Sequence, residues 1–460
     1  MFDALVVGAG IAGLTAAWRL QRAGRSVHIL EAETVPGGNV RTTESSGFRM
    51  EAGPNSFLGS SEYLWKLIRE LGMENEAEPA GASAANRYIL RGGRLYPLPL
   101  GIRTFLQTPL LSVRAKARLA MEPLLPGGAR DDDTAWDFFR RRFGEEAATY
   151  VMSPFVSGVY AGDVRQLGAR SAFSLFWNFE KQKGSMIRGA FSYLRAKKKR
   201  LAREGVPRRK GLFSFPGGLG HFTASLAGRM SGRITAGAAA QSIRRGRDGR
   251  YLVSFAGGTL ESRAVVLAVP PPAAAGLLSG CAPDAAPPMH RIPMAAVSVV
   301  HWTDGRTGTA PPGFGFLVPR VEGVHVLGTL FADQLFRGRA PEGRSLFTSF
   351  YGGMTDPEAF LWDHNTLARQ VRSEHAAIFG DPLPGLHILQ IRRYPTAIPQ
   401  LLPDHFEQLE RVSRCLAAVP GVVLAGNYLT GVGMEHAVES GYRAAGRAEA
   451  FLEGQAGEGR

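Results

Sequence analysis

Residues 4–33, ALVVGAGIAGLTAAWRLQRAGRSVHILEAE, determine the fold that the sequence predicts. The pattern predicts a buried strand, a glycine turn, a helix that ends at Gly24, and a second buried strand at residues 27–30. The turn has the GxGxxG spacing through Gly8, Gly10 and Gly13. The first glycine permits the tight bend, the second lets backbone amides approach a pyrophosphate, and the third lets the helix pack closely on the sheet. The positive end of the helix then faces the anion.

An acidic residue follows the glycines at the spacing that is typical of a ribose-binding carboxylate. Glu31 closes the second strand, about 20 residues after the turn, where a carboxylate accepts hydrogen bonds from ribose hydroxyls. A glutamate rather than an arginine here disfavours a 2′-phosphate. Glycines alone also mark ordinary turns, but strand, turn, helix, strand and acid occur here in order. The sequence therefore predicts a dinucleotide-binding unit.

Composition sets wider limits. The chain has 460 residues, of which 45% are hydrophobic and 20% charged, which is ordinary for a globular protein of two or three domains. The first strand leaves no room for a signal peptide, and no apolar run reaches the roughly 18 residues of a membrane span. We therefore expect a cytoplasmic protein. Cys281 and Cys415 are too few for a disulfide scaffold, and no histidine spacing indicates a metal site.

The net charge of +14 favours an acidic partner. The densest basic run, residues 195–210, follows an aromatic stretch with helical spacing, whose rings we expect on one side of a helix: Phe173, Phe176, Trp177 and Phe179, with Phe191 and Tyr193 further on. Aromatic rings beside cations suit an interfacial helix on anionic lipid, whereas a core stripe beside a solvated face gives the same pattern. Both interpretations stay open. No nucleic-acid-binding signature accompanies the charge.

The remaining chain alternates between structural types. The patterns predict a helix over residues 62–72, a hairpin that turns at Gly92 and Gly93, and a mostly helical region over residues 100–205. A block rich in strands follows the prolines at 270–272. Residues 421–451 then repeat the opening pattern of strand, glycines and helix, so a second helix N-terminus can face an anion.

Six motifs carry a resemblance to a known family. They are GPNSF (53–57), NRYI (86–89), VYAGDVRQL (159–167), GFGFLVP (313–319), AIPQ (397–400) and GNYLTGVGM (426–434). Together with the opening motif and Gly37, Gly38, Arg41 and Thr42, they make the chain resemble the flavin-dependent protoporphyrinogen oxidases, within the amine-oxidase-type flavoproteins. The resemblance covers nearly the whole chain.

The resemblance implies an α/β fold with a Rossmann-like FAD-binding domain of the amine-oxidase/p-hydroxybenzoate-hydroxylase type, a mixed-sheet substrate domain and an inserted helical membrane-binding domain. We expect the FAD-binding domain at 1–80, 206–272 and 388–460, the substrate domain at 81–99 and 273–387, and the helical domain at 100–205. A peripheral position on the inner face of the cytoplasmic membrane would follow.

The resemblance also implies where FAD binds. The pyrophosphate would lie over Gly8 to Gly13, the adenosine ribose on Glu31, and the isoalloxazine near Gly38, Gly53 and Val432. The other residues assigned to FAD are Ile11, Ala12, Ala32, Asn39, Arg41, Pro54, Asn55, Ser56, Ala240, Asn427, Gly433 and Met434.

By the same resemblance, a porphyrinogen would lose six electrons through FAD to dioxygen, with release of three hydrogen peroxide. Arg87 would pair with a ring propionate. Apolar residues would hold the macrocycle, namely Phe314, Gly315, Leu317 and Phe350. We expect no side-chain acid or base and no metal, and a downstream chelatase is a partner by pathway logic alone.

Several positions depart from the family pattern. Tyr394 and Leu401 flank AIPQ where Trp and Tyr are usual, and Glu435, His436 and Ala437 replace an Asn, Asp, Cys-type triplet. A coproporphyrinogen oxidase of the same flavin family is the nearest alternative. An amine oxidase, a phytoene-type desaturase and a non-catalytic relative of the GDP-dissociation inhibitors fit the motifs less well.

Overall fold

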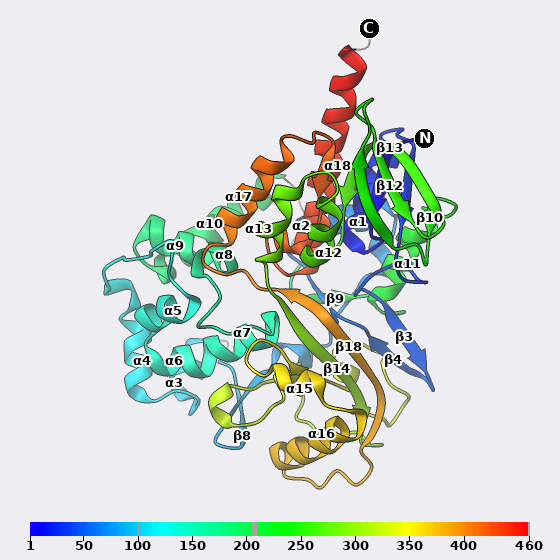
Figure 1. Cartoon of the computed structure of the whole chain (residues 1–460). Coiled ribbons are helices and arrows are strands. Elements are labelled where there is room, and N and C mark those ends of the chain that lie inside the picture. The colour runs from blue at the N-terminus through cyan, green and yellow to red at the C-terminus, as the bar shows by residue number, and fades with distance from the viewer. Residues whose placement is uncertain (100, 205–208, 459–460) are drawn as a thin grey trace.

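Two seven-stranded sheets organise the molecule, with a helical region beside them (Figure 1). The computed structural model describes residues 1–99, 101–204 and 209–458. Both described ends of the chain lie beside the first sheet, at the top of Figure 1, and the helical region lies at the left. The predicted α/β class is confirmed.

The first sheet is built on the opening strand. Its order is β10-β2-β1-β13-β12-β11, and β19 pairs in parallel with the end of β13. The strands are β1 (Phe2–Val7), β2 (Val27–Leu30), β10 (Ile234–Thr235), β11 (Ala240–Arg245), β12 (Tyr251–Phe255), β13 (Gly258–Leu267) and β19 (Val422–Leu424). Ala4 and Val6 enter one core, and Leu5 and Val7 enter the other. Alternate side chains fill both cores because the strand is buried on both faces.

Helices cover both faces of this sheet. One core packs against α1 (Ile11–Arg22), α2 (Glu62–Glu70), α11 (Leu219–Gly228) and α18 (Met434–Glu458). The other packs against α12 (Pro271–Leu278), α13 (Ala286–His290) and α17 (His405–Leu416). The predicted strand, turn, helix and strand of residues 4–33 are therefore observed as β1, α1 and β2.

The second sheet has the order β18-β14-β17-β16-β15-β7-β8. Its strands are β7 (Arg87–Arg91), β8 (Arg94–Pro97), β14 (Met294–Thr303), β15 (Gly315–Leu317), β16 (Gly328–Phe331), β17 (Phe347–Gly352) and β18 (His387–Pro399). The predicted hairpin is β7–β8, with Gly92 and Gly93 at positive φ. Helix α16 (His364–Phe379) packs on one face, which we call the outer face, through Leu367 and Val371.

Two predicted domain boundaries are wrong. Residues 387–399 form β18, which pairs along β14 in the second sheet, whereas we predicted residues from 388 onward to belong with the first strands of the chain. Helices α12 and α13 pack in the core of the first sheet through Ala274 and Met289, whereas we predicted residues from 273 onward to belong with the other sheet. Composition alone does not reveal which core an apolar segment joins.

The region between β8 and β9 is helical, as predicted. It contains α3 (Ile102–Gln107), α4 (Val113–Ala120), α5 (Ala135–Phe143), α6 (Glu145–Ala147), α7 (Ser153–Tyr160), α8 (Ala169–Ala172), α9 (Ser174–Lys183) and α10 (Met186–Glu204). Residues 205–208 of the basic run lie outside the described residues. Across the described ranges, no helix combines the length and hydrophobicity that a membrane span requires.

The aromatic residues of this region differ in burial, although Phe173 and Phe176 both contact the ring of Phe139. Phe173 and Trp177 are buried in the helical core, and Phe179 is buried beside α10. Phe176 and Phe191 are exposed, Phe191 by 72%. The buried rings therefore fit the interpretation as core residues, and the exposed rings of Phe176 and Phe191 fit the interpretation as lipid-facing residues.

Smaller elements connect these parts. They are β3 (Thr42–Ser45), β4 (Phe48–Glu51), β5 (Phe57–Leu58), β6 (Glu78–Pro79), β9 (Leu212–Ser214), α14 (Ala332–Leu335) and α15 (Pro357–Leu361). Glu51 of β4 and Arg339 form a buried ion pair at 2.9 Å. Glu51 also accepts a hydrogen bond from the backbone of Leu219, so the pair joins the two sheets' domains.

Candidate functional site

The glycine turn leaves an open cradle. A Cβ on Gly13 would lie 1.9 Å from the carbonyl oxygen of Gly8, so Gly13 permits the close packing of α1. A Cβ on Gly10 would meet no described atom within 4 Å. Gly38 approaches from a second loop, where its Cβ would lie 3.1 Å from the Cα of Gly10. Space beside Gly10, walled by two glycine loops, is what a pyrophosphate requires.

Glu31 lies against this cradle. Its side chain is buried, and its two carboxylate oxygens accept hydrogen bonds from the backbone of Ala9, at 2.5 Å, and Glu33, at 2.8 Å. Ala238 donates to the carbonyl of Glu31 at 2.7 Å, and the predicted Ala240 begins β11 two residues later. The predicted ribose position is thus beside the cradle.

The predicted residues between 38 and 56 lie in two segments, residues 38–41 and 53–56, which flank the β3–β4 hairpin and contact each other. The carbonyl oxygen of Asn39 would lie 2.5 Å from a Cβ on Gly53, and Asn55 donates to the carbonyl of Gly53 at 3.1 Å. The carbonyl of Arg41 accepts a hydrogen bond from Ala52 at 2.7 Å. The Nε of Arg41 is buried and has no hydrogen-bond partner among the described residues. Pro54 and Ser56 lie in the second of these segments, Ile11 and Ala12 open α1, and Ala32 follows Glu31.

A further loop with glycines, residues 426–433, precedes α18. Asn427 donates to the carbonyl of Val432 at 3.1 Å, which fixes the loop before Gly433 and Met434, and Val432 also packs against the helical region. His436 lies beside Gly433, and burial lowers the pKa of its imidazole.

Glu435 has a structural role that sequence reasoning missed. Its carboxylate accepts hydrogen bonds from the backbone of Tyr63 and Leu64, at 2.8 and 2.9 Å, at the start of α2. Burial raises the pKa of Glu435, and these hydrogen bonds oppose the rise. A carboxylate so placed satisfies free amides of a helix N-terminus. This departure from the family pattern is therefore explained by α2.

Register places four of the five predicted substrate residues on one face of the second sheet. Gly315 pairs with Arg87, Leu317 with Gly328, and Gly328 with Phe350. Paired residues point to the same side of a sheet. We call this the inner face. Arg392 lies on the same face, because it pairs with Val299, which pairs with Phe350. Arg392 donates to Thr43 at 2.5 Å, so the inner face is directed toward the FAD-binding domain.

Arg87 is exposed at the edge of this face. Its guanidinium lies 5.1 Å from the ring centroid of Phe314, which brings the fifth predicted residue to the site. In the part of the chain that the structure describes, no carboxylate lies within ion-pair distance of Arg87. Gly315 cannot be replaced without strain, because it has φ +144° and a Cβ there would lie 2.1 Å from the carbonyl of Thr329.

Helix α7 adds a wall that was not predicted. A Cβ on Gly158 would lie 2.2 Å from Leu317, so α7 packs directly against the inner face. Phe155 and Val159, on the same side of the helix, are 40% and 42% exposed. Exposed apolar side chains beside an apolar sheet face are typical of a ligand site. The motif VYAGDVRQL, which begins in α7, indicated the family, but it did not predict the contact of α7 with Leu317.

These features fit a bound flavin dinucleotide. The cradle at Gly10 would take the pyrophosphate, and the buried Nε of Arg41, whose side chain lies close to Gly37, is a free donor among the described residues. By the resemblance, the isoalloxazine ring and a substrate would lie between the inner face and the loop at Val432. These features are those of a flavoprotein oxidoreductase.

Comparison with known proteins agrees with this class. The model of the family described as flavin containing amine oxidoreductase matches residues 11–448, and the chain belongs to that family. It is an FAD-dependent oxidoreductase.

Individual relatives are more specific. Protoporphyrinogen oxidase 1, chloroplastic, of Arabidopsis thaliana is 31% identical over 98% of this chain and 88% of its own length. Coproporphyrinogen III oxidase of Bacillus subtilis is 26% identical over 97% and 98%. The crystal structure of a candidate protoporphyrinogen oxidase from Exiguobacterium sp. 255-15 has a TM-score of 0.81 at 26% identity and covers 98% of both chains. UDP-galactopyranose mutase, with a TM-score of 0.71 at 16% identity, shares the fold alone.

Proposed function

We propose that this protein oxidises protoporphyrinogen IX to protoporphyrin IX, with dioxygen as the final electron acceptor. The observation that carries the proposal is the inner face, where Arg87, Gly315, Leu317 and Phe350 lie in register, with Phe314 beneath Arg87. A flat apolar ring with carboxylate arms is complementary to an apolar sheet edged by a guanidinium group. The chloroplast relatives support this substrate class.

FAD, when bound, supplies a two-electron acceptor that dioxygen re-oxidises. The chain's own residues then have to bind and orient. Arg87 fixes one edge of the macrocycle by a two-point contact with a propionate. A different edge of the ring is then directed to the loop at Val432. Leu317, Phe350 and the exposed side of α7 exclude water from the ring faces, which suits an apolar donor.

Substrate turnover tests the proposal. We expect the FAD-loaded protein to oxidise protoporphyrinogen IX with a kcat/KM at least about tenfold above that for coproporphyrinogen III, since two further carboxylates would meet apolar walls. Porphyrin fluorescence and peroxide release measure both reactions under air. A faster reaction with coproporphyrinogen III would assign the alternative activity, and no turnover of either substrate would refute the proposal.

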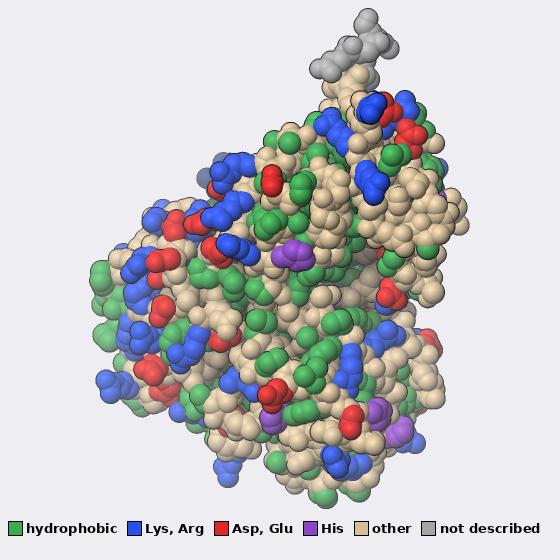
Figure 2. Space-filling view, in the orientation of Figure 1, with side chains coloured by type: hydrophobic (Ala, Val, Ile, Leu, Met, Phe, Trp, Pro, Cys, Tyr) green, Lys and Arg blue, Asp and Glu red, His purple; other side chains and the backbone are tan. Residues whose placement is uncertain are grey.

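The helical region also has the features of a membrane-contacting surface, which we propose as a peripheral site for anionic lipid. Ile102, Val113 and Leu124 are exposed by 82%, 81% and 78%, and Phe191 of α10 by 72%. Residues 101–121 carry four Lys or Arg and no Asp or Glu. Figure 2 shows hydrophobic and basic side chains interspersed along the edge formed by this region. Apolar side chains that enter the headgroup boundary beside cations favour such binding.

A further inference from the structure

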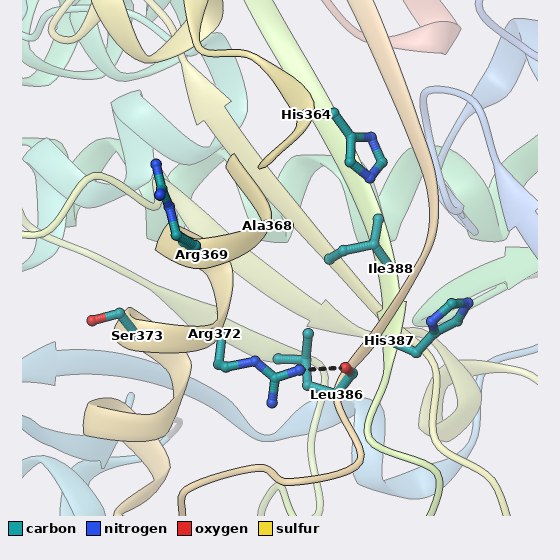
Figure 3. Close-up of a pocket in the computed structure, with 8 residues that line it drawn as sticks. All are labelled: His364, Ala368, Arg369, Arg372, Ser373, Leu386, His387 and Ile388. Atoms are coloured by element: carbon teal, nitrogen blue, oxygen red, sulfur yellow. Dashed lines mark hydrogen bonds between the residues drawn. The ribbon is translucent and has the colours of Figure 1, made fainter. Parts of the chain in front are cut away.

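A pocket lies on the outer face of the second sheet, opposite the proposed substrate site, because its residue Ile388 pairs with Trp302 in the core that packs against α16. Figure 3 shows its lining residues. The pocket has a volume of about 430 Å³ between α16 and the start of β18. Its residues are His364, Ala368, Arg369, Arg372, Ser373, Leu386, His387 and Ile388. The apolar members come from both elements, and the eight residues include no Asp or Glu.

The two arginines of this pocket form no ion pair among the described residues, although the charge of Arg369 adds to the backbone hydrogen bond of Thr366 in lowering the pKa of Asp363. Arg372 donates to the carbonyls of Leu383 and Leu386, at 2.6 and 2.7 Å, and Figure 3 shows it reaching from α16 to Leu386. Arg369 donates to Thr366 at 3.2 Å. Neither arginine has a carboxylate within ion-pair distance among the described residues. Asp363, at the start of α16, accepts a hydrogen bond from the backbone of Thr366 at 2.7 Å as the helix cap.

We propose that this pocket binds an amphipathic carboxylate, a molecule with an apolar body and an acidic arm. Ala368, Leu386 and Ile388 contact the apolar body, and Arg369 pairs with the carboxylate while Arg372 holds the loop behind it. Apolar walls with a few convergent polar groups are the usual form of a small-molecule site. A fatty acid and the porphyrin product share this chemistry, so the experiment has to distinguish them.

Fluorescence of dansylundecanoate, added to the FAD-loaded protein, reports on the pocket directly. We expect Arg369→Glu to weaken binding by reversing the charge and Ala368→Phe to weaken it by filling the space, each at least about fivefold. Arg411→Glu, an exposed arginine of α17, is the matched control and should bind as the parent does. Arg87→Ala should also bind as the parent does, which separates this pocket from the proposed substrate site.

Competition identifies the source of the ligand. Displacement of the probe by dodecanoate but not by protoporphyrin IX assigns a fatty acid, whereas displacement by protoporphyrin IX in the Arg87→Ala protein assigns the porphyrin. Retained flavin content shows that each variant is folded. No saturable probe binding, or equal binding by Arg369→Glu, Ala368→Phe and Arg411→Glu, would overturn the inference while leaving the proposed oxidase activity untouched.

Discussion

Gly10 and Gly13 lie in one turn, but substitutions at them should have different consequences. A side chain on Gly13 meets the backbone of Gly8, so even alanine should impair folding. A side chain on Gly10 meets open space that the pyrophosphate would occupy. We therefore predict that Gly10→Val folds normally but loses FAD, measured as the ratio of flavin absorbance to protein after gel filtration. Normal flavin content in the folded variant would contradict the placement of the cofactor.

Arg87 should control substrate binding rather than cofactor binding. A hydrogen bond to a charged group contributes about 1.5–3 kcal/mol, so we predict that Arg87→Ala lowers kcat/KM by about ten- to a hundredfold. Arg87→Lys should recover only part, because an ammonium cannot form the planar two-point contact. Porphyrin fluorescence against porphyrinogen concentration, normalised to bound FAD, measures this. Unchanged kinetics in Arg87→Ala would make Arg87 an ordinary surface residue.

His375 on the outer face links stability to pH. Its Nδ1 lies 2.8 Å from the carbonyl of Val371 and therefore carries the proton, while Nε2 contacts the Thr329 hydroxyl at 2.7 Å. Burial lowers the pKa of His375 to about 4. The unfolded chain, with a histidine pKa of about 6.5, binds a proton that the folded chain does not. The contribution of His375 to the free energy of unfolding should thus fall by about 1.4 kcal/mol per pH unit as pH drops from 6.5 toward 4.

The variant His375→Gln tests this assignment. We expect it to have a shallower pH dependence of the free energy of unfolding, measured by denaturant titration between pH 7 and 4.5. His301 is also buried with its pKa lowered to about 4, so part of the slope should remain. Identical slopes for the parent and the variant would contradict the assignment.

At the scale of elements, a buried ionic cluster holds the helical region together. Arg142 of α5 is fully buried and pairs with Glu122 and with Glu180 of α9. Glu122 also accepts hydrogen bonds from Ser185 and the backbone of Met186, at 2.6 and 2.8 Å, so it caps α10. One guanidinium group thereby fixes three segments of the chain.

Removal of this cation should loosen α10. Breaking a buried ion pair leaves uncompensated charge and destabilises by about 3–5 kcal/mol. We predict that Arg142→Met increases limited proteolysis at the lysines of α10 in the FAD-loaded protein. Arg140→Met, on the same helix but half exposed, is the control and should be cleaved at the rate of the parent. Equal cleavage of both variants would show that the cluster does not hold α10.

Local sequence patterns predicted several helices and strands correctly. They failed where residues far away in the sequence determine which sheet a segment joins. β1, α1, β2 and the β7–β8 hairpin follow from apolar periodicity and glycine position within short windows. β18 was assigned to the wrong domain because its partner, β14, lies about 90 residues earlier along the sequence. The same holds for the site: residue spacing located the cradle, but the register that unites Arg87 with Phe350 and the contact of α7 with Leu317 depend on tertiary packing. The cluster around Arg142 gave no local signal at all.

At the scale of the whole molecule, the exposed apolar and basic residues of the helical region should set where the protein binds. We predict binding to anionic but not neutral vesicles, weakened by salt, since each Lys or Arg near the surface contributes about 1 kcal/mol. The double variant Ile102→Glu, Val113→Glu should lose binding. Leu361→Glu changes a residue that is 76% exposed in α15 and is the control. Vesicle co-sedimentation measures both, and equal binding to neutral vesicles would contradict a role for the cations.

The order in which the first sheet is assembled constrains how the protein is made. Val6 pairs with Val266, and Val266 pairs with Val423, so β13 from the middle of the chain joins strands from the beginning and the end of synthesis. During translation β1 and β2 must wait for β13 with an unpaired edge, which invites chaperone binding. The loop at Val432 emerges from the ribosome later still. Flavin capture is therefore a late event, and a premature stop after β2 but before residue 422 should leave a colourless chain even though its glycine turn is intact.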